Sequence, residues 1–364
     1  MTAGREFIPH AVSPLRKKNL SMSILDKIFG NDDQPRTTPG KPDIMMQKVL
    51  DTFAELGGKP IETLSPQEAR QQPTPTDAVK KILRDTVKDE DPTLGIQTRD
   101  ITIDGAAGPL QARIYSPNLD SDDLKPLVVY FHGGGFVIAD LDVYDGGPRG
   151  LSRFADVVVL SVHYRQAPEN KFPAAHDDAF AAWQWALANA QSFGGDPQKV
   201  AIMGESAGGN LACATAIRAR DEGVQAPVHM VLVYPVAGND MTTPSYIENA
   251  TAKPLNKPMM EWFVKHTFND VSETEDTRLN LVEADLIGLP SATVICAEID
   301  PLRSEGELLA ERLEQAGVEV RHKTFHGSTH EFFGMALVVP DAAAAQTFAS
   351  HELKRAFGTA ILPI

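Results

Sequence analysis

A serine that can act as a nucleophile lies in the segment Gly204-Glu205-Ser206-Ala207-Gly208, between two segments of different character. The apolar run at 199–202 predicts a buried strand, and the small, helix-forming residues at 207–221 predict a helix. A serine hydroxyl is a weak nucleophile, so it must be held toward a base, and a sharp strand-to-helix turn does this. Gly204 and Gly208 leave room where the turn brings backbones together. A helix that merely starts with a capping serine is the alternative explanation.

Three consecutive glycines follow another apolar run, 127–131, in the segment His132-Gly133-Gly134-Gly135-Phe136. A plain turn needs only one or two glycines, and each additional one costs conformational entropy. We expect the N–H groups of Gly133 and Gly134, together with the N–H of Ala207 at a helix N-terminus, to bind an oxyanion. A flexible turn is the alternative. A phosphate cradle is disfavoured because the sequence contains no G-x-x-x-x-G-K-[ST] motif.

A candidate base lies in the segment 326–333, which follows a predicted strand at 318–325 and contains two histidines. We expect His330 to be the base and His326 to be the alternative. His132 is expected to hold the glycine loop by hydrogen bonding. The remaining histidines are interpreted as surface residues or as core residues with satisfied hydrogen bonds.

A carboxylate that can orient the base follows the apolar run 292–297, at Asp300-Pro301. Such a group fixes the orientation of a histidine and stabilises its cation. Asp300 also fits a helix N-cap with Pro301 at the first helical position, and the two roles are compatible. Glu298 and Glu305 are the competing carboxylates, but neither lies in a matching turn.

Composition limits the remaining possibilities. The chain has 364 residues, of which 42% are apolar and 23% charged, as in an ordinary globular protein, and its net charge of −15 argues against nucleic acid and anionic membranes as partners. Cys213 and Cys296 lie in apolar runs and are expected to be core residues, and the sequence contains no C-x-x-C spacing that would suggest a metal site. No membrane span is expected. Because Arg16-Lys17-Lys18 is not followed by an apolar run, we expect a cytoplasmic protein.

Buried strand patterns alternate with helical patterns, which predicts an α/β fold with a mostly parallel sheet. We divide the chain into an N-terminal arm (1–42), two cap helices (43–90), a first part of the catalytic core (91–236), a helical cap insertion (237–286) and a second part of the core (287–364). Sites in such sheets lie at the carboxyl ends of the strands, so the motifs above are expected to meet at one edge.

The motifs together resemble the bacterial hormone-sensitive lipase family of esterases, also called family IV. The chain order Ser206, Asp300, His330 is that of the α/β-hydrolase triad. The motif at 132–136 and the segment 164–175, Tyr164-Arg165-Gln166-Ala167-Pro168-Glu169 continued by Phe172-Pro173-Ala174-Ala175, are also similar to family signatures. The resemblance covers about residues 43–360.

The resemblance implies an α/β-hydrolase fold with a helical cap and hydrolysis of short-chain esters without a cofactor. Ser206 would be the nucleophile, His330 the base and Asp300 its orienting carboxylate. Three positions depart from the family pattern: Glu205 where Asp is common, His163 where an acidic residue is usual, and Glu331 where glycine is usual.

We therefore expect a carboxylesterase acting on a small-molecule ester, with a homodimer left open as its assembly. An amidase, or a deacetylase acting on acetylated sugars or natural products, would use the same residues, so the sequence does not distinguish these enzymes from a carboxylesterase. A non-catalytic ligand receptor on the same fold is the rival class, and it would be expected to carry a damaged triad.

Overall fold

The computed structural model describes residues 40–86, 92–121 and 123–360. The predicted arm at 1–42 therefore lies almost entirely outside the described residues. Among the described helices are α2 (Ile44–Glu55), α3 (Pro66–Ala69), α4 (Pro75–Thr86), α5 (Gly146–Leu151), α6 (Ala174–Asn189), α7 (Ala207–Asp221), α8 (Pro244–Glu248), α9 (Lys257–Thr267), α10 (Arg303–Gln315) and α11 (Pro340–Ala356).

The described residues form one sheet of eight strands in the order β1-β2-β4-β3-β5-β6-β7-β8. The hairpin β1–β2 and the pair β2–β4 are antiparallel, and the other pairs are parallel, which confirms the predicted α/β class. The strands are β1 (Gln97–Gly105), β2 (Gly108–Ser116), β3 (Lys125–Phe131), β4 (Val158–His163), β5 (Gly195–Glu205), β6 (Met230–Val233), β7 (Ala292–Ile299) and β8 (Val320–Thr329).

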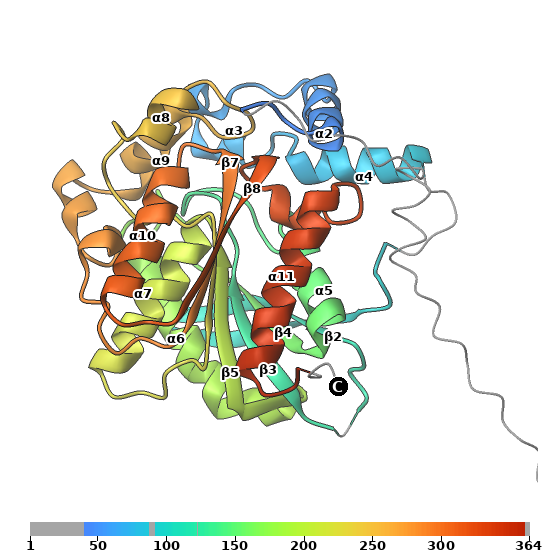
Figure 1. Cartoon of the computed structure of the whole chain (residues 1–364), viewed down its shortest axis with the longest axis vertical. Helices are drawn as coiled ribbons and strands as arrows, with labels where there is room; N and C mark the ends of the chain where they lie inside the picture. The colour runs from blue at the N-terminus through green and yellow to red at the C-terminus, as the bar shows by residue number, and fades with distance from the viewer. Residues whose placement is uncertain (1–39, 87–91, 122, 361–364) are drawn as a thin grey trace, which may run out of the picture.

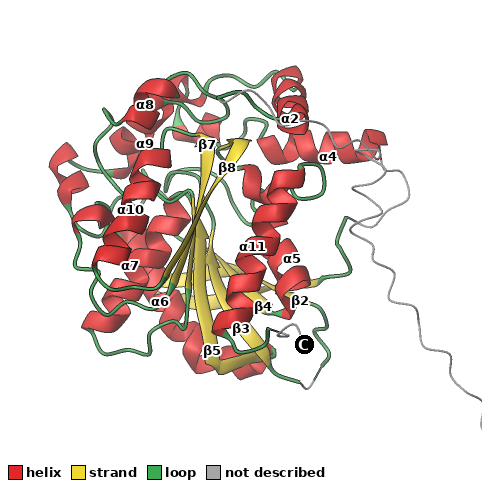
Figure 2. Ribbon diagram, viewed as in Figure 1, coloured by secondary structure: helices red, strands yellow, loops and turns green. Residues whose placement is uncertain are grey.

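Helices cover both faces of this sheet (Figures 1 and 2). In the view of Figure 1, α6, α7 and α10 lie on one side of the strands and α5 and α11 on the other. Strand β3 shows why both faces are covered: Leu127, Val129 and Phe131 belong to one apolar cluster, Val128 and Tyr130 belong to another, and all five side chains are fully buried. Alternate residues of a strand point to opposite faces, so a continuous apolar run requires a layer on each side.

The helical segments at 43–86 and 237–286 lie across the carboxyl end of the sheet. In Figure 1, α2, α3 and α8 appear above the arrowheads of β7 and β8. Helix α2 begins at a well-formed cap, in which the Asp43 carboxylate accepts hydrogen bonds from Met45 N and Met46 N, both at 2.8 Å. Arg70, at the end of α3, binds the carboxylate of Glu169 and the carbonyl oxygens of Val137 and Ala167, which joins this layer to the core.

Some predicted boundaries are wrong. The last strand runs to Thr329 rather than to residue 325, because the pairing of β7 with β8 shifts register between Ala297 and Ile299 and then continues to the pair Ile299–Thr329. His330 therefore follows the strand directly. Helices α5 and α11 are not among the predicted elements, although α11 opens with proline in its first turn and is rich in alanine.

The buried carboxylate of Asp178 in α6 joins three segments. It accepts hydrogen bonds from Ala106 N in the β1–β2 turn and from both the backbone N–H and the guanidinium of Arg165, which follows β4. The Asp178 side chain is fully buried. Removing one partner of a buried ion pair leaves the other charge and several donors without compensation.

We expect Asp178→Ala to lower the free energy of unfolding by about 3–5 kcal/mol. The matched control is Asp177→Ala: the neighbouring carboxylate pairs with Arg218 at 3.1 Å, but both side chains are 41% exposed. Its loss should cost less than about 1 kcal/mol. Urea unfolding followed by circular dichroism measures both, and equal losses would contradict the structural role of Asp178.

Candidate active site

Ser206 lies at the sharp turn between β5 and α7. Its backbone has φ 58° and ψ −119°, which is an unusual conformation for a residue other than glycine. The glycines on either side are required by space: a Cβ at Gly204 would overlap the Gly208 carbonyl, and one at Gly208 would overlap the carbonyl of Phe131 in β3. Ser206 occupies the N-cap position of α7, but its side chain makes no capping hydrogen bond. The hydroxyl is therefore left for another partner.

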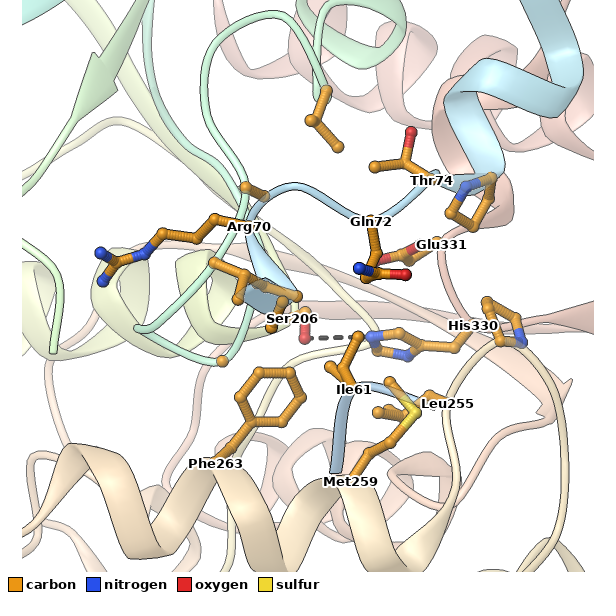
Figure 3. Close-up of a pocket in the computed structure, with 18 of the residues that line it drawn as sticks. Ile61, Arg70, Gln72, Thr74, Ser206, Leu255, Met259, Phe263, His330 and Glu331 are labelled. Carbon is orange, nitrogen blue, oxygen red and sulfur yellow. Dashed lines mark hydrogen bonds between the residues drawn. The ribbon is translucent and has the colours of Figure 1, made fainter. Parts of the chain in front are cut away.

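That partner is His330, the residue that follows β8 (Figure 3). The Ser206 Oγ and His330 Nε2 atoms are 3.0 Å apart, and His330 Nδ1 lies 2.6 Å from Asp300 Oδ2. Because a carboxylate only accepts, the Nδ1–H group donates to Asp300, and Nε2 is left to accept from the serine hydroxyl. All three side chains are buried. This is the geometry in which an imidazole can remove a proton from the hydroxyl.

Asp300 is not the N-cap of α10, and in this respect the sequence analysis was wrong. The cap is Leu302 and the helix begins at Arg303, so Pro301 precedes the helix. The two oxygens of the fully buried carboxylate have different partners: Oδ2 accepts from His330, and Oδ1 accepts from Leu302 N at 2.9 Å. The second bond fixes the carboxylate relative to the turn after β7.

The competing residues lie elsewhere. His326 is exposed, and its Nδ1 lies 3.5 Å from Glu298 Oε1 rather than near Ser206. Glu298 accepts from Gly327 N at 2.7 Å, and Glu305 accepts from Ala237 N at 2.8 Å. Neither glutamate forms a hydrogen bond with His330 in the described part of the chain.

The glycine loop is held by aromatic and histidine side chains. His132 Nδ1 lies 2.7 Å from the Gly133 carbonyl oxygen, and the Tyr164 hydroxyl donates to the His132 carbonyl oxygen at 2.9 Å. A Cβ at Gly133 would overlap the Tyr144 hydroxyl, and one at Gly134, whose φ is 107°, would overlap the Ile138 carbonyl. Side chains are therefore excluded at both glycines.

Three buried backbone N–H groups are available next to Ser206. Among the described residues, the N–H groups of Gly133, Gly134 and Ala207 donate to no acceptor. Buried amides nearly always have a partner, so three without one mark a place where an acceptor atom of a ligand can bind. Of the three residues, Gly134 lines the cavity that contains Ser206.

Two glutamates place negative charge near His330. Glu205 is almost completely buried and accepts hydrogen bonds from the hydroxyls of Tyr130 and Tyr234. Burial raises the pKa of the Glu205 carboxyl to about 7, although the two tyrosine hydrogen bonds oppose the rise. Glu331 is half-buried and accepts from the Tyr144 hydroxyl at 3.1 Å, and burial raises its pKa as well. Sequence reasoning identified the glutamates as departures but missed the three tyrosines, which no local motif marks.

The net effect on His330 is a raised pKa. Burial of the imidazole lowers the pKa, but the charge and hydrogen bond of Asp300, followed by the charges of Glu331 and Glu205, more than offset that effect.

The backbone of Glu331 is unusual, because it has φ 66°, in the left-handed region. Glycine adopts that conformation without strain, which gives a physical reason for the glycine that the family resemblance leads one to expect here.

Ser206 and His330 open on a cavity of about 400 Å³ that lies between the core and the overlying helices. Residues from both helical segments line it, including Phe53, Ile61 and Arg70 from the first and Leu255, Met259 and Phe263 from the second. Figure 3 shows Phe263 and Met259 pointing from α9 into this cavity. A volume of this size suits a small organic ligand.

Three further observations concern the described residues as a whole. Within the described ranges, no cluster of three or more His, Cys, Asp or Glu side chains is arranged to hold a metal ion. Cys213 and Cys296 are buried free thiols, as expected. None of the helices described here has the length and apolar character that crossing a membrane requires.

Comparison with known proteins gives a consistent result. A family model for the alpha/beta hydrolase fold matches residues 128–334. The carboxylesterase NlhH of Mycobacterium tuberculosis is 36% identical over 327 residues, 88% of this chain and 98% of that protein. Ethyl acetate hydrolase of Pseudomonas putida is 33% identical over 309 residues, 83% of this chain and 94% of that protein.

Solved structures agree with these relatives. A hyperthermophilic esterase from the archaeon Pyrobaculum calidifontis superposes with a TM-score of 0.78 at 34% identity, covering 89% of this chain and all of that one. The thermostable carboxylesterase EstE1 from a metagenomic library superposes with a TM-score of 0.73 at 36% identity, covering 81% of this chain and 98% of that one. This chain belongs to the alpha/beta hydrolase fold family and, within it, to the hormone-sensitive lipase-like group that its motifs predict.

Proposed function

We propose that this protein is a carboxylesterase that hydrolyses short-chain esters of small molecules. The observation that carries the proposal is the hydrogen-bonded series Asp300–His330–Ser206, which opens on a cavity of about 400 Å³. The names of the relatives, carboxylesterase and ethyl acetate hydrolase, support the same reaction class.

In the proposed mechanism, Ser206 Oγ attacks the ester carbonyl carbon while His330 Nε2 removes the hydroxyl proton. Asp300 holds the imidazole in the required tautomer and stabilises its cation. When the tetrahedral intermediate collapses, His330 protonates the departing alkoxide, which leaves as the alcohol. Water, activated by the same imidazole, then hydrolyses the acyl-enzyme.

The carbonyl oxygen becomes an oxyanion in the intermediate and is assigned to the N–H groups of Gly133, Gly134 and Ala207. Their lack of another acceptor supports this role. A preorganised donor of this kind contributes about 3–4 kcal/mol to lowering the barrier. The positive end of the α7 dipole, which starts at Ala207, acts in the same direction.

The segments 43–90 and 237–286 are proposed to form a cap over the site. Both supply residues to the wall of the cavity, and Trp262 of α9 donates a hydrogen bond to the Leu64 carbonyl oxygen at 3.0 Å, which joins the two segments. A cap excludes water and gives the substrate an apolar environment.

We expect Ser206→Ala to lower kcat by a factor of about 10⁴–10⁶, because the remaining groups bind and polarise the ester but form no acyl-enzyme. The assay is hydrolysis of p-nitrophenyl acetate, with mass spectrometry of the acylated protein as a second readout. Ser192→Ala, at an exposed serine, is the control. A folded Ser206→Ala variant with a near-unchanged rate would rule out Ser206 as the nucleophile.

An amidase or a deacetylase acting on acetylated sugars or natural products uses the same groups. The reaction class is tested with a matched pair, p-nitrophenyl acetate and p-nitroacetanilide, which differ only in the atom that leaves. We expect kcat/KM for the ester to exceed that for the anilide by more than about 100-fold, or roughly 2.7 kcal/mol of transition-state stabilisation. Comparable values would favour the amidase. A non-catalytic receptor would turn over neither compound.

Glu331 should set the acidic limb of the pH–rate profile. His330 acts as a base only when neutral, and the Glu331 carboxylate favours its protonated form, so that carboxylate moves the limb to higher pH. Removing the charge with Glu331→Gln should lower the His330 pKa and move the limb of kcat/KM to lower pH. Glu331→Gly should shift it in the same direction.

The control for these variants is Glu314→Gln, which removes the same charge at an exposed position on α10. The profiles are measured with one short-chain ester. Superimposable acidic limbs for all four proteins would show that Glu331 has no influence on the base.

A further inference from the structure

A second cavity of about 360 Å³ lies against α9, beside the cavity that contains Ser206. Its wall is mostly apolar, with side chains from α9, from the loop after β6 and from the residues that follow α9. The apolar side chains include Phe136, Met241, Tyr246, Val264, Phe268 and Leu279.

The two cavities share part of their walls. Gly135, Val236, Met260 and Phe263 line both of them. The Phe263 ring packs directly on Gly135, where any Cβ would overlap ring carbons. The side chains of Val236, Met260 and Phe263 therefore form the movable part of the partition, whereas Gly135 contributes backbone. Methionine is unbranched and flexible, so Met260 is the side chain of the partition that changes conformation most easily.

The second cavity lies on the acyl side of the proposed reaction. The departing alkoxide must lie next to His330 to receive a proton, so the alcohol part of the ester occupies the region around His330 and Glu331. Neither of these residues lines the second cavity, whereas Gly135, which adjoins the proposed oxyanion donors, does. An acyl chain that extends away from His330 therefore leads toward the partition.

We propose that the second cavity is a distal acyl compartment, which receives the hydrocarbon end of medium-length acyl chains when Met260 moves aside. This inference rests on the proposed esterase function. The occupant is uncharged, because none of the described residues that line the cavity is a cation and Glu261 at its exposed rim is an anion. A carboxylate or phosphate would be repelled there.

The adjacent methionines of α9 provide a matched test. Met260 lines both cavities, whereas Met259 lines only the one that contains Ser206. Met260→Ala removes part of the partition, and Met259→Ala removes the same atoms without opening it. We expect Met260→Ala to raise the ratio of kcat/KM for p-nitrophenyl octanoate to that for p-nitrophenyl acetate by about tenfold or more. Met259→Ala should change that ratio much less.

Filling the compartment should have the opposite effect. Val264 lines only the second cavity and is half-buried, so Val264→Phe adds volume there. This variant should lower the octanoate-to-acetate ratio about tenfold relative to the wild type, and it should cancel the gain in a Met260→Ala background. Equal effects of the two methionine variants, or a ratio that Val264→Phe leaves unchanged, would overturn the proposal.

Binding separates this proposal from the proposed function. In a Ser206→Ala background, calorimetry with methyl octanoate should show binding that is about tenfold weaker when Val264→Phe is added. If p-nitrophenyl acetate is not hydrolysed, the esterase function fails, but the binding difference still supports the apolar compartment. If the acetate is hydrolysed and octanoate binding is insensitive to Val264→Phe, only the compartment fails.

Discussion

Backbone atoms of β3, β5 and α7 meet at van der Waals distance around the turn that carries Ser206, and the rest of the site depends on this close approach. Only hydrogen atoms fit on the Cα of Gly204 and Gly208, because the carbonyls of Gly208 and Phe131 occupy the space that a side chain would need. The approach also places the glycine loop that follows β3 beside the first amide of α7. A single steric constraint thus positions both the hydroxyl and the N–H groups assigned to the oxyanion.

The charges at the site are arranged around one imidazole. Asp300 contacts it directly, and Glu205 and Glu331 act on it through space, each held by tyrosine hydroxyls. Burial alone would favour a neutral His330, whereas three acidic groups favour its cation. Their balance gives a base that is readily protonated in the first step and can pass the proton to the departing group in the second.

The sequence predicted those parts of the fold that depend on local pattern. The strand–turn–helix around Ser206, the α/β class and the extent of α7 follow from periodicity and glycine spacing, and the structure confirms them. The cap boundaries and the roles of Ser206, Asp300 and His330 remain proposals, although the structure brings the three side chains together. Other features depend on contacts between distant segments. Tyr130, Tyr144 and Tyr234 come from three separate strands or loops, and the extension of β8 to Thr329 depends on a register shift against β7.

The backbone of Ser206 has a consequence for how such a protein evolves. A residue other than glycine at φ 58° carries about 1–2 kcal/mol of conformational strain, and the surrounding fold must offset it. Glycine at this position would relieve the strain and leave no hydroxyl. Selection for thermostability alone would therefore favour loss of the serine, and the residue persists only where selection acts on turnover. In this fold, stability and activity compete at a single residue.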